Sequence, residues 1–137
     1  MKFLAASALL FALVTPVLAE EAAITGDATA GATVFKKCAA CHAIGEGAKN
    51  KVGPQLNDLL GRTAGTAPDY KYSKAMMEAG ANGLVWTPET LVPYLHKPKD
   101  VVPGTKMAFP GLPNEEDEKN LIAYLATFSP NYVPAAQ

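Results

Sequence analysis

Apolar residues recur at helical spacing near the C-terminal end of the chain. The residues that follow this spacing are Leu121, Tyr124, Leu125 and Phe128. They are related as i, i+3, i+4 and i+7, which places them on one face of a helix. Asn114 can cap the start of this helix, and acidic residues 115–118 fill its first turn, where the helix dipole favours negative charge. The pattern therefore predicts a final amphipathic helix with one buried face.

An N-terminal helix is predicted to begin after Asp27, which can cap it, and to carry Val34 and Phe35 at helical spacing. Gly31 lies inside this segment, where it costs up to ~1 kcal/mol relative to alanine. A close crossing with another helix would explain the missing side chain. We expect the final helix to provide that crossing, with Tyr124 as the contact.

Two shorter helices are predicted in the middle of the chain. Ser73 can cap one that runs through Ala79, with Gly80 as its C-terminal stop, and Thr87 can cap another with Pro88 at its first position. Pro93 falls inside the second of these helices and removes a backbone hydrogen bond, so we expect a kink there. No segment has a convincing strand pattern. The sequence therefore predicts an all-α fold with loops that contain glycine and proline.

The most apolar stretch lies at the N-terminus and is organised as an export signal. Lys2 precedes an apolar run from Phe3 to Val14, and Ala19 ends a cleavage site of small residues. The run is shorter than the ~20 residues that a transmembrane helix needs. We expect residues 1–19 to be a cleaved signal peptide and residues 20–137 to form one soluble, extracytoplasmic domain. An uncleaved membrane anchor is the alternative.

Charge and composition mainly exclude classes of protein. With 12 Lys and Arg against 13 Asp and Glu, the net charge is −1, whereas nucleic-acid binding requires a basic excess. Two cysteines are too few for a scaffold rich in disulfides. Only 8% of the 137 residues are aromatic, so a small domain lacks core volume that a bound apolar group could supply.

The strongest chemical motif is Cys38-Ala39-Ala40-Cys41-His42. The pattern C-x-x-C-H is the attachment site of c-type haem, in which two thiols add to the vinyl groups of one porphyrin edge. A spacing of i and i+3 puts both sulfurs on one helical face, and His42 follows as the proximal iron ligand. A thioredoxin-like dithiol or a structural disulfide would be the alternative. The dithiol requires a preceding strand, whereas the residues before Cys38 favour a helix.

An electron-carrying haem iron needs a second axial ligand, for which the candidates are Met76, Met77, Met107 and His96. Met76 and Met77 lie in a predicted helix and favour a core role, and His96 lies near a helix end, where an exposed or capping role is favoured. Met107 lies in the loop 103–111, whose prolines and glycines oppose both helix and strand. The residues alone favour Met107 without excluding the others.

Further motifs follow the C-x-x-C-H segment in order along the chain. They are Val52–Leu56 with Gly61-Arg62, Tyr70–Ser73, Trp86, Tyr94-Leu95, Pro103–Phe109 and Leu121–Leu125. Together with the first motif, they resemble class I cytochrome c, of the bacterial periplasmic type similar to mitochondrial cytochrome c. The resemblance covers Gly26 to Phe128. It implies a small helical cytochrome c fold wrapped around one haem c, covalently bound through Cys38 and Cys41, in the periplasm.

The resemblance also implies roles for individual side chains. His42 and Met107 are the implied axial iron ligands, and the backbone carbonyl of Pro54 is implied to accept the imidazole N–H. Tyr94 resembles the tyrosine beside the methionine sulfur. The implied contacts with the haem propionates come from Arg62, Tyr72 and Trp86.

Two departures from the family pattern are visible. Met76 takes the position of a buried asparagine that the family ties to an internal water, so we expect a different arrangement near the haem. Many relatives carry lysines just after the methionine loop. Here that segment is Pro113, Asn114, Glu115 and Glu116.

The implied function is one-electron transfer and not enzyme catalysis. The protein is expected to act as a monomer, with a quinol–cytochrome c oxidoreductase as donor and a terminal oxidase or photosynthetic reaction centre as acceptor. A haem peroxidase or gas-binding protein is one rival, which would need an open sixth site and a distal residue such as His96. A fixed haem subunit of a larger complex is another. The lysines expected to attract acidic partners are Lys37, Lys49, Lys51, Lys97, Lys99 and Lys106.

Overall fold

The computed structural model describes residues 23–134, so the expected signal peptide lies outside the described residues. The helices in this part are α1 (Ala28–Phe35), α2 (Lys74–Ala81), α3 (Pro88–His96), α4 (Pro98–Val101) and α5 (Glu115–Ala126). Within residues 23–134, the β structure is limited to an isolated antiparallel bridge between Thr63 and Val85. The prediction of an all-α fold is confirmed.

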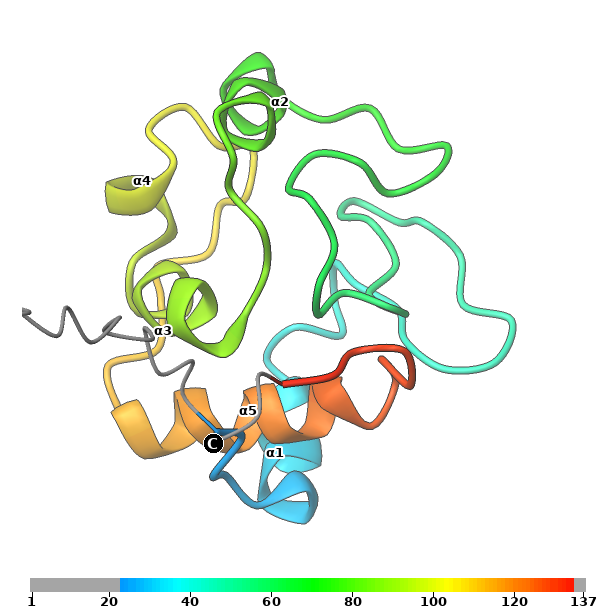
Figure 1. The fold of residues 1–137 in the computed structure, drawn as a ribbon, viewed down its shortest axis with the longest axis vertical. Coiled ribbons are helices and arrows are strands. Elements are labelled where there is room, and N and C mark those ends of the chain that lie inside the picture. The colour runs from blue at the N-terminus through cyan, green and yellow to red at the C-terminus, as the bar shows by residue number, and fades with distance from the viewer. Residues whose placement is uncertain (1–22, 135–137) are drawn as a thin grey trace, which may run out of the picture.

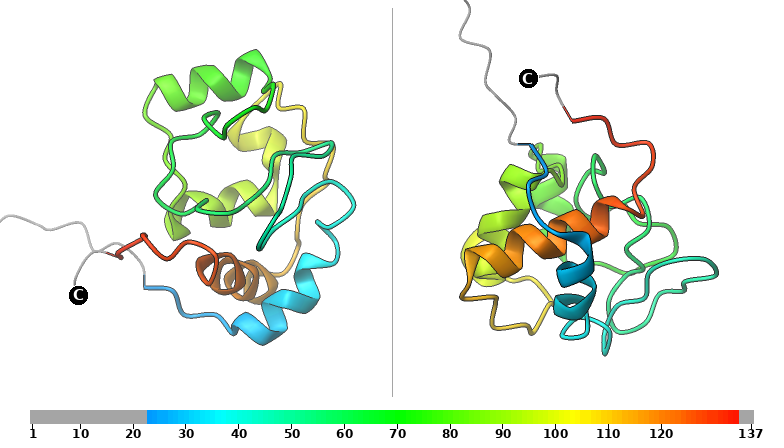
Figure 2. Two further views of the ribbon diagram at one scale, coloured as in Figure 1. Left: turned by 90° about the vertical axis from the view of Figure 1, so that its right-hand side faces the viewer. Right: turned by 90° about the horizontal axis from the view of Figure 1, so that it is seen from below.

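The helices form two groups, with α1 and α5 in one and α2, α3 and α4 in the other (Figure 1). α1 and α5 cross on one side of the molecule, while α2 lies at the far end and α3 and α4 lie between them (Figure 1). The two further views show the same crossing of α1 and α5 (Figure 2). α5 contacts both α1 and α3, and α3 contacts α4. Residues 36–73 contain no helix and close the remaining side with loops.

Four predicted caps are present at the starts of the longer helices. The capping side chains are Asp27, Ser73, Thr87 and Asn114. Each accepts a hydrogen bond from a backbone N–H of the first turn, which would otherwise lack a partner, and such a cap contributes ~1 kcal/mol. Thr87 and Thr90 form a reciprocal pair of hydrogen bonds, and Pro88 occupies the first turn of α3. These capping residues explain where α1, α2, α3 and α5 begin.

The crossing of α1 and α5 depends on Gly31. A Cβ atom at this position would lie 1.9 Å from the backbone oxygen of Asn120 and 2.8 Å from the Cβ of Tyr124. The predicted close crossing is therefore confirmed, although the nearest contact is the backbone of Asn120 and not the ring of Tyr124. The side chain of Asn120 also accepts a hydrogen bond from the backbone N–H of Asp27 at 2.8 Å. This contact fixes the start of α1 against α5.

The prediction that Gly80 ends the second helix is wrong. α2 continues to Ala81, and Gly80 lies inside it. A Cβ atom at Gly80 would lie 1.9 Å from the carbonyl oxygen of Ala64, so the missing side chain allows a loop to pack against the helix. The left-handed residue after the helix is Gly83, with φ of 99°.

The apolar core lies between the α1–α5 pair and α3. Its buried members include Val34, Phe35, Leu59, Leu60, Met76, Trp86, Leu91, Tyr94, Leu95, Leu121, Ile122 and Leu125. The predicted stripe on α5 is confirmed in part, because Leu121 and Leu125 are buried while Tyr124 is half-buried and packs against the ring of Phe35. Phe128, the fourth predicted member, lies beyond the end of α5 at Ala126. Several of these core side chains also form the wall of a large internal cavity.

Candidate functional site

The cavity between the helices encloses about 1330 Å³ of space, part of it open to solvent. Its wall includes every site residue that the sequence predicted, namely Cys38, Cys41, His42, Pro54, Arg62, Tyr72, Trp86, Tyr94 and Met107. Among these nine, Tyr94 comes from a helix, α3, and the others come from loops and turns. The fold therefore gathers residues from across the chain around one space.

The C-x-x-C-H segment follows α1 directly and continues as tight turns. The backbone N–H groups of Cys41 and His42 both donate to the carbonyl of Cys38, at 3.0 and 2.9 Å. These bonds place the two thiols and the imidazole along one wall of the cavity. The two cysteines are not joined in a disulfide, and burial raises the pKa of the Cys38 thiol to about 11.

The imidazole of His42 is held from two sides. Its Nδ1 lies 2.7 Å from the carbonyl oxygen of Pro54, and since that oxygen can only accept, Nδ1 carries the proton and donates. A Cβ atom at Gly53 would lie 2.4 Å from the Cε1 atom of the ring, so glycine is required beside it. Burial lowers the pKa of His42, which favours the neutral ring. Nε2 of a neutral, oriented imidazole is therefore available to a metal.

Met107 is held on the cavity wall by two neighbouring hydroxyl groups, one bonded to its sulfur and one to its backbone. The hydroxyl of Tyr94 donates to the sulfur at 3.4 Å and also lies 3.4 Å from the hydroxyl of Thr105. Thr105 in turn accepts a hydrogen bond from the backbone N–H of Met107 at 3.2 Å. Burial raises the pKa of Tyr94, so its hydroxyl stays protonated and can donate.

The other candidates for a second axial ligand are placed differently. Met76 is buried and lines the cavity, as Met107 does. The side chain of Met77 is half exposed, and neither Met77 nor His96 lies in the cavity wall. The structure thus reduces four candidates to two. Met107 differs from Met76 because a hydroxyl group donates to its sulfur.

Three polar side chains form a further part of the wall. Arg62 donates from Nη1 to the carbonyl of Asn57 at 3.1 Å, and the hydroxyl of Tyr72 accepts from the backbone N–H of Ala67 at 3.2 Å. Burial lowers the pKa of Arg62 and raises the pKa of Tyr72. Trp86 is buried, and its ring packs 4.7 Å from that of Tyr94. This group could hold an anionic part of a ligand.

Sequence reasoning missed several residues of the site. Thr105 contacts both the backbone of Met107 and the hydroxyl of Tyr94, and its position two residues before Met107 in the Pro/Gly loop was the available hint. Other wall residues without an assigned role are Phe35, Leu59, Leu91, Leu95, Phe109, Leu121 and Leu125. Their apolar character indicated a core but could not show that this core surrounds a cavity.

Lysines lie beside the C-x-x-C-H segment and in the Met107 loop, at the edge of the cavity. Lys37 and Lys106 belong to its wall. Lys106 donates from Nζ to the carbonyl of Lys71 at 2.5 Å and lies over the ring of Tyr70, while Lys51 donates from Nζ to the carbonyl of Ala39 at 2.7 Å. Lys51 and Lys106 are therefore exposed charges with anchored positions.

A comparison with known families identifies the fold and the cofactor. The family described as Cytochrome c matches residues 28–129. The chain belongs to the cytochrome c family. It is 59% identical over 110 residues to cytochrome c2 of Agrobacterium tumefaciens (strain II Chrys), covering 80% of this chain and 98% of that protein. It is 54% identical over 105 residues to cytochrome c2 of Afifella marina, covering 77% of this chain and 85% of that protein.

A solved structure supports the same assignment. The structure of cytochrome c2 from Rhodospirillum centenum matches with a TM-score of 0.74 and 44% identity, covering 77% of this chain and all of that chain. The predicted small helical cytochrome c fold is confirmed. As a cytochrome c, the protein carries haem c attached covalently, with Cys38 and Cys41 at the attachment spacing, and it is an electron carrier.

The residues present fit this cofactor. Two thiols, an oriented neutral imidazole and a thioether border one largely apolar cavity. Gly53 leaves room for the imidazole that a side chain would fill.

Among residues 23–134, no helix is long and apolar enough to cross a bilayer.

Proposed function

We propose that this cytochrome c carries single electrons between membrane redox complexes in the periplasm, with His42 and Met107 as the axial ligands of its haem. When bound, the haem would supply one-electron redox chemistry. The chain holds the cofactor, sets its potential and presents it to partners. A His/Met pair raises the reduction potential relative to two histidines.

The observation that carries the proposal is the pair of supported side chains in one cavity. His42 has its Nδ1 proton engaged by Pro54, which leaves Nε2 for the iron and makes the ring a better ligand. Met107 has its sulfur held by the hydroxyl of Tyr94. Ligands that are already oriented need little rearrangement when the charge of the iron changes. Such an arrangement suits electron transfer.

The polar part of the wall suits the two propionate groups of a haem. Arg62 contributes a positive charge, and the hydroxyl of Tyr72 and the indole N–H of Trp86 are possible donors. All three line the cavity, and Arg62 and Tyr72 are half-buried, where charge-assisted hydrogen bonds are stronger than in water. We assign them to the propionates.

Peroxidase or gas-binding activity is the less favoured function. It would need a sixth position open to small molecules and an acid–base group beside it. His96, the histidine that sequence reasoning considered for this role, is outside the cavity wall. The cavity offers Met107 in place of such a group, so we propose that the protein is not an enzyme.

The partners and location extend the same proposal. A quinol–cytochrome c oxidoreductase would be the donor, and a terminal oxidase or photosynthetic reaction centre the acceptor. Residues 1–19 would be removed on export, which leaves residues 20–137 as a monomeric domain. Lys37 and Lys106 at the cavity mouth, with Lys51 nearby, would attract the acidic surface of a partner.

Replacement of Met107 tests the central assignment. Met107→Ala should abolish the near-infrared methionine–iron charge-transfer band of the ferric protein and lower its midpoint potential. Met76→Ala is the matched control, because Met76 is the other methionine of the cavity wall, and it should keep the band. Met77→Ala should also keep it. An unchanged band and potential in Met107→Ala would show that another group binds the iron.

A further inference from the structure

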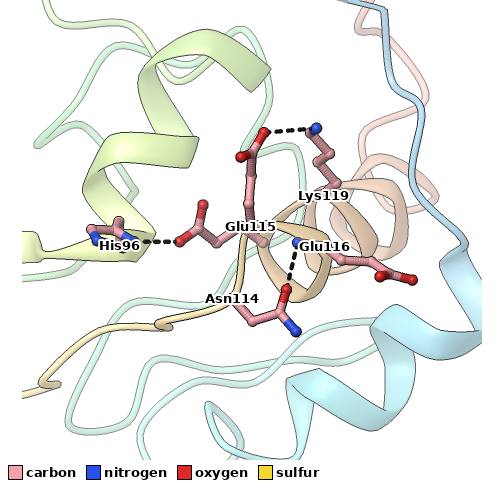
Figure 3. Close-up of polar contacts among 6 residues, drawn as sticks. His96, Asn114, Glu115, Glu116 and Lys119 are labelled. Atoms are coloured by element: carbon pink, nitrogen blue, oxygen red, sulfur yellow. Dashed lines mark hydrogen bonds and ion pairs between the residues drawn. The ribbon is translucent and has the colours of Figure 1, made fainter.

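A buried carboxylate lies at the contact between α3 and α5 and is not part of the cavity wall. Glu118, in the first turn of α5, has only 1% of its side chain exposed. Its Oε1 lies 2.9 Å from Nδ1 of His96, the last residue of α3. The side chain of His96, which Figure 3 labels, is 60% exposed. A carboxylate removed from water is strongly unfavourable unless it is paired, so this contact is the condition for burying Glu118.

The neighbouring acidic residues behave differently. Glu115 pairs with Lys119 one turn further along α5, at 2.7 Å, and Glu116 is exposed (Figure 3). Both side chains remain exposed on the surface of α5. The acidic run 115–118 is therefore not a uniform charged face, since its last member is buried and connects two helices.

The end of α3 that His96 occupies also receives the exit of the Met107 loop. The backbone N–H of Leu112 donates to the carbonyl of Leu95 at 2.8 Å. Gly111, with φ of 110°, passes so close to His96 that a Cβ atom would lie 1.9 Å from the His96 carbonyl oxygen. The loop that carries Met107 is thus attached to the last two residues of α3.

The same turn of α3 supports the Met107 side chain. Tyr94, whose hydroxyl donates to the sulfur, lies two residues before His96. Pro93 lies in the same turn, and the helix continues through it to His96 although proline has no N–H to donate to residue 89. This turn is therefore held to the rest of α3 by fewer backbone hydrogen bonds than a regular helix provides. A tether from outside the helix has more influence on its position.

We propose that His96 and Glu118 form a positioning pair, which holds the last turn of α3 against α5 and thereby keeps Met107 on the iron. The inference rests on the proposed function, because it takes Met107 as the axial ligand. Burial fixes the position of Glu118 on α5, and its hydrogen bond fixes His96 in turn. His96 and Leu95 contact the exit of the Met107 loop, so the pair restrains that loop. Neither residue lies in the cavity wall, so both act through the loop.

The test measures how easily an added ligand displaces the methionine. Imidazole binds ferric haem when the sixth position opens, so its apparent affinity reports the closure of the Met107 loop. His96→Ala should increase the affinity for imidazole about tenfold, a usual size for coupling between two sites, and weaken the charge-transfer band. His96→Asn should restore most of the wild-type behaviour, because its Nδ2 group can take the place of the imidazole Nδ1 donor.

Two further variants separate positioning from general destabilisation. Glu115→Gln is the matched control, since it breaks an ion pair on the same helix that does not involve α3, and its imidazole affinity should equal that of the wild type. His96→Ala with Glu118→Met removes the tether without leaving a buried charge, and is expected to fold even if His96→Ala does not. It should still bind imidazole more tightly than the wild type.

The outcomes distinguish this inference from the ligand assignment. If Met107→Ala loses the charge-transfer band while both variants that lack His96 bind imidazole within twofold of the wild type, the positioning pair is wrong and the ligand assignment stands. An equal increase in Glu115→Gln would also overturn it. If Met107→Ala keeps the band, the ligand assignment fails first.

Discussion

The two ends of the cavity are built in different ways. At the His42 end, haem is attached covalently through neighbouring cysteines, and the imidazole is held by a short following loop through Pro54 and Gly53. At the Met107 end, the side chain and its loop are held by hydrogen bonds, and two of these come from α3, because Tyr94 holds the sulfur and Leu95 holds the loop exit. The first end depends on a local motif, whereas the second depends on where α3 lies.

This difference predicts an order of failure. A disturbance of the helices should release Met107 while His42 and the thioether bonds remain. Loss of His42 before Met107 should require a change inside the C-x-x-C-H motif or in direct contact with the imidazole.

The largest effect is expected from removal of the covalent bonds. In the double variant Cys38→Ala, Cys41→Ala, acidified acetone should extract any bound haem. In the wild type, the haem should remain with the protein. The double variant should also have little stable structure, because haem fills the core of a small domain. Absorbance and far-ultraviolet circular dichroism measure both results. Free extraction from the wild-type protein would contradict covalent attachment.

Steric changes at the two glycines should separate the two ends. Gly53→Ala places a Cβ atom 2.4 Å from the His42 ring and should lower the yield of protein with a correctly bound haem. Gly111→Ala forces a side chain into a left-handed position against the His96 carbonyl, at a cost of about 1–3 kcal/mol, and should weaken the charge-transfer band while the haem stays attached. Haem content per protein and the ferric near-infrared spectrum are the measurements.

Gly47→Asn serves as the control for both glycine variants. A Cβ atom there would meet nothing within 4 Å, and asparagine tolerates the left-handed backbone at φ of 71°. Its spectrum should match that of the wild type. The comparison of the two ends fails if Gly111→Ala loses haem as readily as Gly53→Ala does.

A smaller effect is expected from the hydroxyl group beside the sulfur. Tyr94→Phe removes a donor 3.4 Å from Met107, and a neutral hydrogen bond of this kind contributes about 1 kcal/mol. The sulfur then becomes a better electron donor to ferric iron, so the midpoint potential should fall, by a few tens of mV at most. The charge-transfer band should remain. Tyr124→Phe is the control, since that ring packs against Phe35 and Phe128 and is not part of the cavity wall. A rise in potential would refute the role given to Tyr94.

The smallest and most salt-sensitive effect concerns the lysines. The rate of electron transfer to an oxidase or reaction centre should fall as salt is added, with a shallow slope because acids follow the Met107 loop. At 0.15 M salt the screening length is ~8 Å, so a partner responds to the nearest charges. Lys51→Glu alters the cysteine end and Lys106→Glu the methionine end. Both should slow association at low salt.

The salt experiment also shows which end a partner approaches. A stronger effect of Lys106→Glu would place the docking surface nearer Met107, and a stronger effect of Lys51→Glu would place it nearer the cysteines. Lys99→Glu, on the short helix α4, should likewise slow association, as its sequence position predicts. Rates that increase with salt, or charge-reversed variants as fast as the wild type, would exclude this lysine face as the docking surface.

The sequence alone determined the features that depend on neighbouring residues. The caps at Asp27, Ser73, Thr87 and Asn114 were predictable because a capping side chain bonds to the next turn of its own helix. The C-x-x-C-H motif was predictable because five consecutive residues carry its chemistry. The assignment of Met107, by contrast, was favoured by its loop and implied by a resemblance, and it stays a prediction.

Tertiary structure decided the features that depend on contacts between distant segments. Gly80 looked like the end of a helix, and only its approach to Ala64 explains its place inside α2. Thr105 and the apolar residues of α3 and α5 became part of the site because the fold surrounds a cavity with them. Glu118 looked like one member of a solvated acidic run. Its burial against His96 results from the packing of α3 on α5, and no local pattern encodes the distance between two helices.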